Sequence, residues 1–184
     1  MKANAVRSYL YGGVFTVLVF VFAMIGLRSC TNGPRDTKAV DSASLVNRKW
    51  VSLVKSDGSS LSFVKVTING HETWMLVDSG SGSTLLDLNQ SDKLGIEYSM
   101  DPNAKFTGIG GSNDLGTVLN VDSIRVSGVD YPVRLEVTDL DNVVRIVKNA
   151  TGLYVSGILG SDFMDRNNCS LDYSSGKLFL GLGN

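Results

Sequence analysis

The sequence predicts an all-β domain, for three reasons. Val64, Val66 and Ile68 alternate with polar residues, which is the period of a strand that buries one face. The pair Asn69-Gly70 directly after them is typical of a type I′ hairpin turn. The chain also holds 20 glycines among its 184 residues, a content that suits many tight turns. Together these features indicate antiparallel strands joined by short loops.

Further strands follow this first one along the chain. Residues 73–77 complete the first hairpin, and residues 117–126 and 131–137 form a second predicted pair, since apolar and charged residues alternate in the last of these. The apolar residues within 142–149 fit neither the helical nor the strand period. A short helix and a surface loop therefore both stay open for that segment.

The C-terminal part of the sequence predicts a final hairpin. Residues 169–173 and 177–181 have strand composition, and the turn residues Ser174-Ser175-Gly176 separate them. With 43% hydrophobic residues, the chain has enough apolar side chains for one core. We assign that core domain to residues 47–184.

The candidate catalytic residue is Asp78, which ends an apolar strand and is followed by Ser79 and Gly80. Peptide hydrolysis without a metal or a covalent nucleophile needs one carboxylate to take a proton from water and a protonated partner to polarise the carbonyl. Gly80 allows a tight turn and leaves a backbone N–H near the carboxylate, while the Ser79 hydroxyl can form a hydrogen bond. An ordinary strand-ending turn of Asp, Ser and Gly is the alternative interpretation.

Three runs of the sequence, taken in order, resemble the motifs of retropepsin-like aspartic proteases, the single-lobed relatives of pepsin. The first is Asp-Ser-Gly at 78–80, with a small residue and an apolar strand after it. The second resembles the glycine-rich tip of the flap that closes over bound peptide: Gly108, Ile109, Gly110 and Gly111. The third resembles the second family signature: Ile158, Leu159 and Gly160. Read alone, the glycine-rich run is equally a plain hairpin turn.

The resemblance covers residues 60–181 and implies a single-lobed acid-protease fold with one short helix. It implies that Gly160 lets its strand pass close beneath the active-site loop, that Ser83 supports this loop, and that the helix begins at Ser161 as its N-cap. The sequence departs from compact viral members by an apparent insertion at residues 139–151 and by Gly82. These departures leave the shape of the substrate groove open.

Only one Asp-Ser-Gly triplet occurs in the chain. A two-lobed pepsin, which duplicates this triplet, is therefore excluded. If Asp78 is catalytic, its partner is Asp78 of a second copy, and the active form is a homodimer with the site on its two-fold axis. The resemblance further implies that the substrate is a protein or peptide in an extended conformation.

Composition disfavours several other functions. A formal net charge of −1, without a basic stripe, gives no electrostatic footprint for nucleic acid. The single His71 lacks a second His or a nearby Cys, so we predict no metal site and no cofactor. Cys30 lies beside the predicted membrane segment, whereas Cys169 lies far along the chain in a predicted core strand. These positions do not suggest a disulfide framework. A serine hydrolase is disfavoured because the sequence contains no Gly-x-Ser-x-Gly motif.

The N-terminal region predicts a membrane anchor. Residues 9–27 carry no charged side chain, a length that can just span a bilayer, and Lys2 and Arg7 precede them. Positive charge at the N-terminus favours an orientation with that end inside the cell. We therefore expect residues 1–28 to form a transmembrane helix that leaves the protease domain outside the cytoplasm, in the periplasm or at the surface of a bacterial cell.

Two alternatives remain for this region. One is a cleaved secretory signal, which also begins with positive charge, although this apolar run is longer than is typical of such signals. Leu27-Arg28-Ser29-Cys30 also loosely resembles a bacterial lipobox, in which Cys30 becomes lipidated, but Arg28 is unusual there. In each case the polar residues 29–46 form a linker between membrane and domain.

Two functions of different classes follow from the sequence. The first is a membrane-tethered aspartic endopeptidase with a homodimeric Asp78 dyad. The second is a catalytically inactive β-domain of the same fold that binds extended peptides along its exposed strand edges. The sequence identifies neither the physiological substrate, nor the cleavage specificity, nor the pH optimum.

Overall fold

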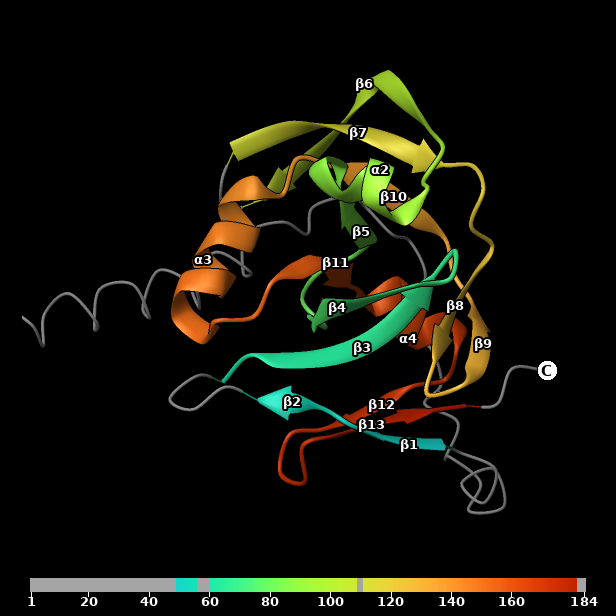
Figure 1. Ribbon diagram of the computed structural model, residues 1–184, viewed down its shortest axis with the longest axis vertical. Coiled ribbons are helices and arrows are strands. Elements are labelled where there is room, and N and C mark those ends of the chain that lie inside the picture. Colours follow the sequence, from blue (N-terminus) through green and yellow to red (C-terminus); the bar gives the residue numbers. More distant parts are fainter. Residues whose placement is uncertain (1–48, 56–59, 109–110, 182–184) are drawn as a thin grey trace, which may run out of the picture. The chain divides into compact units, whose positions relative to one another are not determined.

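The computed structural model describes residues 49–55, 60–108 and 111–181 (Figure 1). The chain divides into two compact units, of which the larger comprises Val40–Phe106 and Ser112–Asn184. Of the smaller unit, the structure describes Thr107, Gly108 and Gly111. Within the described ranges no helix is long and apolar enough to cross a membrane. The predicted anchor and linker, with Cys30, lie outside the described residues, as do Ile109 and Gly110.

Strands make up most of the fold. In chain order they are β1 (Lys49–Ser52), β2 (Val54–Lys55), β3 (Ser62–Ile68), β4 (His71–Val77), β5 (Thr84–Asp87), β6 (Tyr98–Gly108), β7 (Gly111–Val118), β8 (Ser123–Val126), β9 (Val129–Pro132), β10 (Leu135–Thr138), β11 (Val155–Leu159), β12 (Ser170–Asp172) and β13 (Lys177–Leu180). The helical elements are η3 (Leu88–Gln90), α2 (Ser91–Leu94), α3 (Asp141–Thr151) and α4 (Ser161–Arg166). This content confirms the all-β prediction.

The strands form a ten-stranded and a three-stranded sheet. In the larger sheet the order is β6-β7-β10-β5-β11-β4-β3-β8-β9, and β2 pairs with β3 beside this path. Strand β11 lies between β4 and β5, parallel to β4 and antiparallel to β5. The smaller sheet has the order β1-β13-β12, in which β12 and β13 are the predicted final hairpin.

The first predicted hairpin is confirmed with its register. Strands β3 and β4 pair antiparallel from Ile68 opposite His71 to Ser62 opposite Val77. Asn69 and Gly70 between them have φ angles of 47° and 82°. Two successive positive φ angles define a type I′ turn, which Asn-Gly adopts with little strain. This hairpin carries the chain directly to Asp78.

The second predicted strand pair was wrong in its extent. Residues 117–126 split into the end of β7 and β8, and residues 131–137 split into the end of β9 and β10. Strand β8 pairs with β9, whereas β7 pairs with β10. Pro132, which has no N–H for a ladder bond, ends β9 and separates the two segments.

The described residues contain three α-helices, where the resemblance implied one short helix. Helix α4 is the expected one, but Gly160 is its N-cap, and Ser161 is the first helical residue. The segment left open at 142–149 lies in α3, where Val144 and Val147 are buried. Helix α3 ends at Gly152, whose φ of 76° closes the helix in the left-handed region.

Apolar residues pack on both faces of the sheet at β4, because side chains alternate along a strand. Met75 and Val77 belong to the main core, which includes Phe163 of α4. Leu76 belongs instead to a second cluster, whose members include residues of α3. The strand that leads to Asp78 is thus buried on both faces, which fixes the starting point of the loop.

Candidate active site

Asp78 lies immediately after β4, and backbone hydrogen bonds fix its position. Its N–H donates to the carbonyl of Leu159 on β11 at 3.1 Å, which continues the ladder between these strands by one residue. Its own carbonyl accepts from the N–H of Ser81 at 3.1 Å, which closes a tight turn. Its side chain is half-buried, and Oδ1 accepts from the N–H of Gly80 at 2.9 Å. The carboxyl group therefore leaves a rigid strand end in a defined direction.

Burial raises the pKa of Asp78 above that of an exposed aspartate, and the backbone N–H groups of Gly80 and Ser81 act in the opposite direction. Loss of water disfavours the charged form, whereas hydrogen bonds from N–H groups favour it. A carboxyl group that keeps its proton at higher pH is suited to general acid–base chemistry. The described environment of Asp78 therefore fits a catalytic carboxyl group.

The loop after Asp78 is held by helix α4. The carbonyl of Ser81 accepts two hydrogen bonds from Ser161, one from its N–H at 2.8 Å and one from its hydroxyl at 2.9 Å. The buried hydroxyl of Ser81 donates to the carbonyl of Ser83 at 2.7 Å. Ser83 thus contributes to the loop through its backbone. Ser79 and Gly80 are exposed at the tip of this turn.

Gly160 lies directly against this loop. A Cβ atom at Gly160 would overlap the carbonyl group of Ser83, and one at Gly157 would overlap the carbonyl oxygen of Leu85. Both glycines therefore permit β11 to approach the loop and β5 closely. The structure thus places Gly160 against the carbonyl group of Ser83. Ile158 and Leu159 are buried beside it.

Thr84 and Asp162 form a hydrogen-bonded link that the sequence did not reveal. The Thr84 hydroxyl donates to Oδ1 of Asp162 at 2.6 Å and accepts from the N–H of Gly160 at 3.1 Å. Thr84 is fully buried. A threonine at the start of a strand was the available signal, but its partner Asp162 lies far away in the sequence. This link joins the active-site loop to the second glycine motif.

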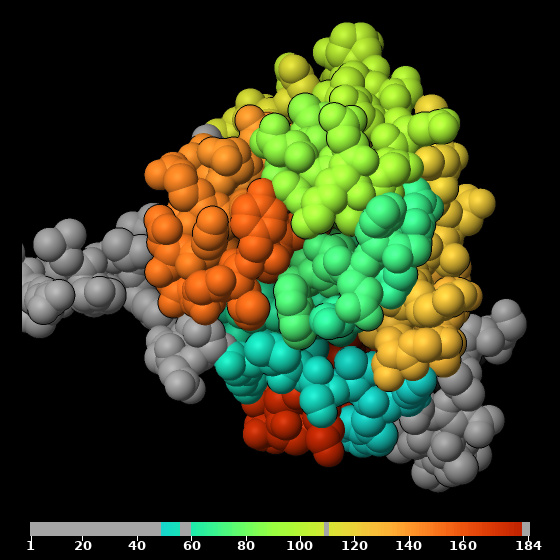
Figure 2. Space-filling model, in the orientation of Figure 1, coloured from blue at the N-terminus to red at the C-terminus, as the bar shows by residue number. Residues whose placement is uncertain are grey.

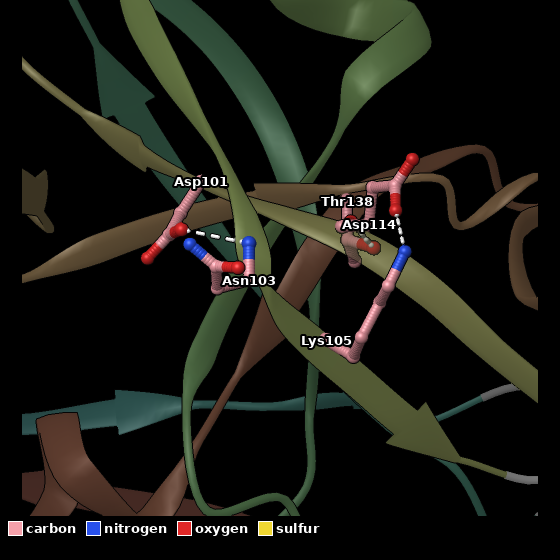
Figure 3. Close-up of polar contacts among 5 residues, drawn as sticks. All are labelled: Asp101, Asn103, Lys105, Asp114 and Thr138. Carbon is pink, nitrogen blue, oxygen red and sulfur yellow. Dashed lines mark hydrogen bonds and ion pairs between the residues drawn. The ribbon is translucent and has the colours of Figure 1, made fainter.

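The hairpin of β6 and β7, predicted to be the flap, is fastened to β10 through β7 (Figure 3). The buried hydroxyl of Thr138 donates to the carbonyl of Asp114 at 2.7 Å, and the side chain of Asp114 forms an ion pair with Lys105 across the hairpin. Asn113 adds a bond from Nδ2 to the carbonyl of Asp139 at 2.7 Å. Gly108 ends β6 and Gly111 begins β7. The hairpin is thus anchored two or three residues from the nearest of its glycines.

On the outer strand of this hairpin, Oδ1 of Asp101 accepts from the N–H of Asn103 at 2.9 Å (Figure 3). Pro102 between them has no N–H to offer at this sheet edge. Within the described ranges, no three His, Cys, Asp or Glu side chains gather closely enough to hold a metal ion.

Comparison with known proteins places this geometry in a family. The family model described as aspartyl protease matches residues 64–163, the stretch from β3 to α4. No curated protein matches the chain.

Three solved structures with similar folds illustrate the likeness. The EIAV protease complexed with the inhibitor HBY-793 is 19% identical over 65% of this chain and 99% of that chain, with a TM-score of 0.48. A retropepsin-like aspartic protease from Rickettsia conorii is 18% identical over 72% of this chain and 98% of that chain, with a TM-score of 0.49. The retroviral protease-like domain of Ddi1 from Leishmania major is 17% identical over 66% of this chain and 89% of that chain, with a TM-score of 0.48. Since the family model spans more than half of the sequence and includes Asp78, the chain belongs to the aspartyl protease family.

Proposed function

We propose that the chain is a retropepsin-like aspartic endopeptidase that works as a homodimer. The observation that carries the proposal is the half-buried Asp78 at a rigid strand end, with a pKa raised by burial. Membership of the aspartyl protease family supports the reaction class. The presence of a single Asp-Ser-Gly triplet supports the dimer, because this chemistry uses two carboxyl groups.

In the proposed mechanism the two Asp78 carboxyl groups share one proton. Two carboxylates about 3 Å apart cannot both ionise comfortably, and burial adds to this effect. The ionised carboxylate takes a proton from water, whose oxygen adds to the peptide carbonyl carbon. The protonated carboxyl group donates its hydrogen bond to the carbonyl oxygen. The C–N bond then breaks, and a proton passes to the leaving amine.

The neighbours of Asp78 have separate proposed roles. The N–H of Gly80 orients the Asp78 carboxylate. The exposed hydroxyl of Ser79 can rotate to form a hydrogen bond with Ser79 of the second copy. Ser83 and Gly160 keep the loop and β11 in contact. The flap residues Gly108, Ile109, Gly110 and Gly111 close over an extended peptide substrate.

We further propose that residues 9–27 tether the domain to a membrane and that it faces away from the cytoplasm. The apolar run and the preceding positive charges support this orientation. A tether raises the effective concentration of neighbouring copies and so favours a weak dimer. A reporter fused after Asn184 should be active outside the cytoplasm, and a cytoplasmic signal would contradict the orientation.

The proposed function is tested with the full chain in detergent and a diverse peptide library, from acid to neutral pH. Wild type should cleave, and Asp78→Asn should lose cleavage while it keeps its fold, as judged by circular dichroism. The matched control is Asp92→Asn, an exposed carboxylate on α2. A folded wild type that binds library peptides but never cleaves them would favour the inactive peptide-binding domain instead.

A further inference from the structure

The three-stranded sheet of β1, β13 and β12 has one face against the core and one face in solvent. Leu178 and Leu180 of β13 are fully buried in the main core. Side chains alternate along a strand, so Phe179 between them lies on the opposite face. Trp50 of β1 pairs with Phe179, the two rings are in contact, and Trp50 is 52% exposed. We call this solvent face, with its two aromatic rings, the outer face of the sheet.

Two lysines lie close to exposed aromatic residues at this sheet. Nζ of Lys177 is 5.3 Å from the centroid of the Trp50 ring, which is within the range of a cation–π interaction. Nζ of Lys55 donates to the carbonyl of Tyr173 at 2.7 Å, and Tyr173 is 56% exposed. Aromatic rings and amino groups are thus combined on one part of the surface.

Positive charge predominates in the two segments that build this sheet. Residues 49–55 and 169–181 contain three lysines and one acidic residue, Asp172, although the whole chain has a formal net charge of −1. The Asp172 carboxylate accepts four hydrogen bonds from the N–H and hydroxyl groups of Ser174 and Ser175. It is therefore engaged within its own turn. Figure 2 shows the surfaces of residues 49–55 and of the C-terminal hairpin next to each other.

The sheet also lies where the chain enters the domain. Strand β1 begins at Lys49, three residues after the predicted linker of residues 29–46. An extended linker of that length spans at most about 60 Å, so a tethered domain stays close to the bilayer surface. Tryptophan and tyrosine are enriched at the boundary between lipid headgroups and acyl chains, and lysine is attracted to anionic headgroups. The composition of the sheet therefore fits the surface that the linker brings nearest to it.

We propose that the outer face of the sheet docks on an anionic phospholipid surface, with Trp50 at the headgroup boundary and Lys55 and Lys177 against lipid phosphates. The proposal goes beyond catalysis and rests on the proposed membrane tether. One tryptophan and a few lysines give only weak binding to a free domain, but the tether keeps the sheet at a high effective concentration near the lipid. Docking then holds the tethered domain in one orientation on the membrane.

The two tryptophans of the chain permit a direct test. Trp74→Phe leaves Trp50 alone, and Trp50→Phe leaves the half-buried Trp74 as the matched control. Both full chains are reconstituted into vesicles of phosphatidylcholine and phosphatidylglycerol, with or without bromine on the acyl chains close to the headgroups. Brominated lipid should lower the emission of Trp50 by about half, because the ring reaches the acyl boundary, and should leave the emission of Trp74 nearly unchanged.

A second comparison tests the role of charge. In the Trp74→Phe chain, Lys177→Glu should reduce the quenching of Trp50, as should vesicles of phosphatidylcholine alone or high salt. The control is Lys93→Glu, at an exposed position on α2, which should leave the quenching unchanged. Quenching that depends neither on anionic lipid nor on Lys177 would overturn the proposed recognition of an anionic surface.

The outcomes also separate this inference from the proposals on which it does not depend. Flotation with the vesicles reports the tether, and peptide cleavage by wild type in detergent reports the proposed catalytic function. A chain that does not float contradicts both the tether and the docking. A chain that floats while brominated lipid leaves Trp50 unquenched overturns the docking alone. If Trp50 is then also shielded from acrylamide, the outer face is covered by protein, such as a second copy, instead of lipid.

Discussion

The hydroxyl of Thr84 donates a hydrogen bond to Oδ1 of Asp162 at 2.6 Å, and this bond links the strand after the active-site loop to the helix after Gly160. Thr84 also accepts from the N–H of Gly160 at 3.1 Å. Two segments far apart in the sequence are thereby held at one fixed distance. The position of Asp78 depends on this link as well as on its own strand.

Removal of the Thr84 hydroxyl should therefore destabilise the domain and lower activity. Thr84→Val leaves the carboxylate of Asp162 and the N–H of Gly160 without this partner, which should cost about 1–3 kcal/mol in the free energy of unfolding. Urea denaturation and kcat measurements check this. Thr117→Val, at an exposed position on β7, is the control and should leave both quantities nearly unchanged. Equal stability of both variants would contradict the structural role of Thr84.

Substitution by alanine should destabilise the domain strongly at Gly160 and only slightly, if at all, at Gly82. At Gly160 a Cβ would overlap the backbone of Ser83, so Gly160→Ala should cost about 3 kcal/mol or more. At Gly82 nothing lies within 4 Å of a Cβ, so Gly82→Ala should stay within about 1 kcal/mol of wild type. Thermal unfolding of the two variants measures this difference. Similar melting temperatures would show that β11 does not approach the loop as described.

The free energy of unfolding should depend on pH through Asp87. Burial raises the pKa of Asp87, against hydrogen bonds from the N–H groups of Leu140 and Asn89. The folded chain therefore holds this proton more tightly than the unfolded chain, whose aspartate pKa is about 3.9. The contribution of Asp87 to stability is greatest below that value and falls as pH rises through the folded pKa.

Asp87→Asn keeps the oxygen that accepts from Leu140 but cannot ionise. The variant should thus gain stability relative to wild type as pH rises from about 4 to 7. Urea denaturation across this range measures the gain. A constant difference between the two proteins would indicate that Asp87 does not titrate at a raised pKa.

The flap hairpin should loosen when the bond between β7 and Thr138 of β10 is lost. Thr138→Val removes the hydrogen bond to the carbonyl of Asp114, at a cost of about 1 kcal/mol. Hydrogen exchange of β7 amides should become faster, and KM should rise more than kcat falls. Lys105→Ala breaks an exposed ion pair and should cost less than about 1 kcal/mol. Faster hydrogen exchange in Lys105→Ala than in Thr138→Val would contradict this account, because it would show that the ion pair holds the hairpin more firmly than the Thr138 hydrogen bond.

The sequence predicted those parts of the fold that depend on residues close together in the chain. Asn69-Gly70 defined a hairpin and its register because only a few residues tolerate two positive φ angles. The position of Asp78 followed from the apolar strand before it. The motif at 158–160 placed Gly160 against Ser83, since a side chain has no room there.

Features that depend on tertiary contacts were not predicted. Helix α3 has no clean period within 142–149, and its fold depends on the burial of Val144 and Val147 against the sheet. The interruption of two predicted strands depends on which neighbour each half pairs with. Thr84 and Asp162 are common residues whose bond is visible only once β5 and α4 meet.

The measurement that tests the central claim most directly is activity in mixtures of wild type and Asp78→Asn, refolded together at constant total concentration well above that needed for dimers. If both copies of Asp78 form one site, activity should fall as the square of the wild-type fraction, to about one quarter in an equal mixture. If each chain acts alone, activity should fall linearly, to about one half. The account predicts the quadratic result, and a linear fall would contradict a site shared between two Asp78 residues.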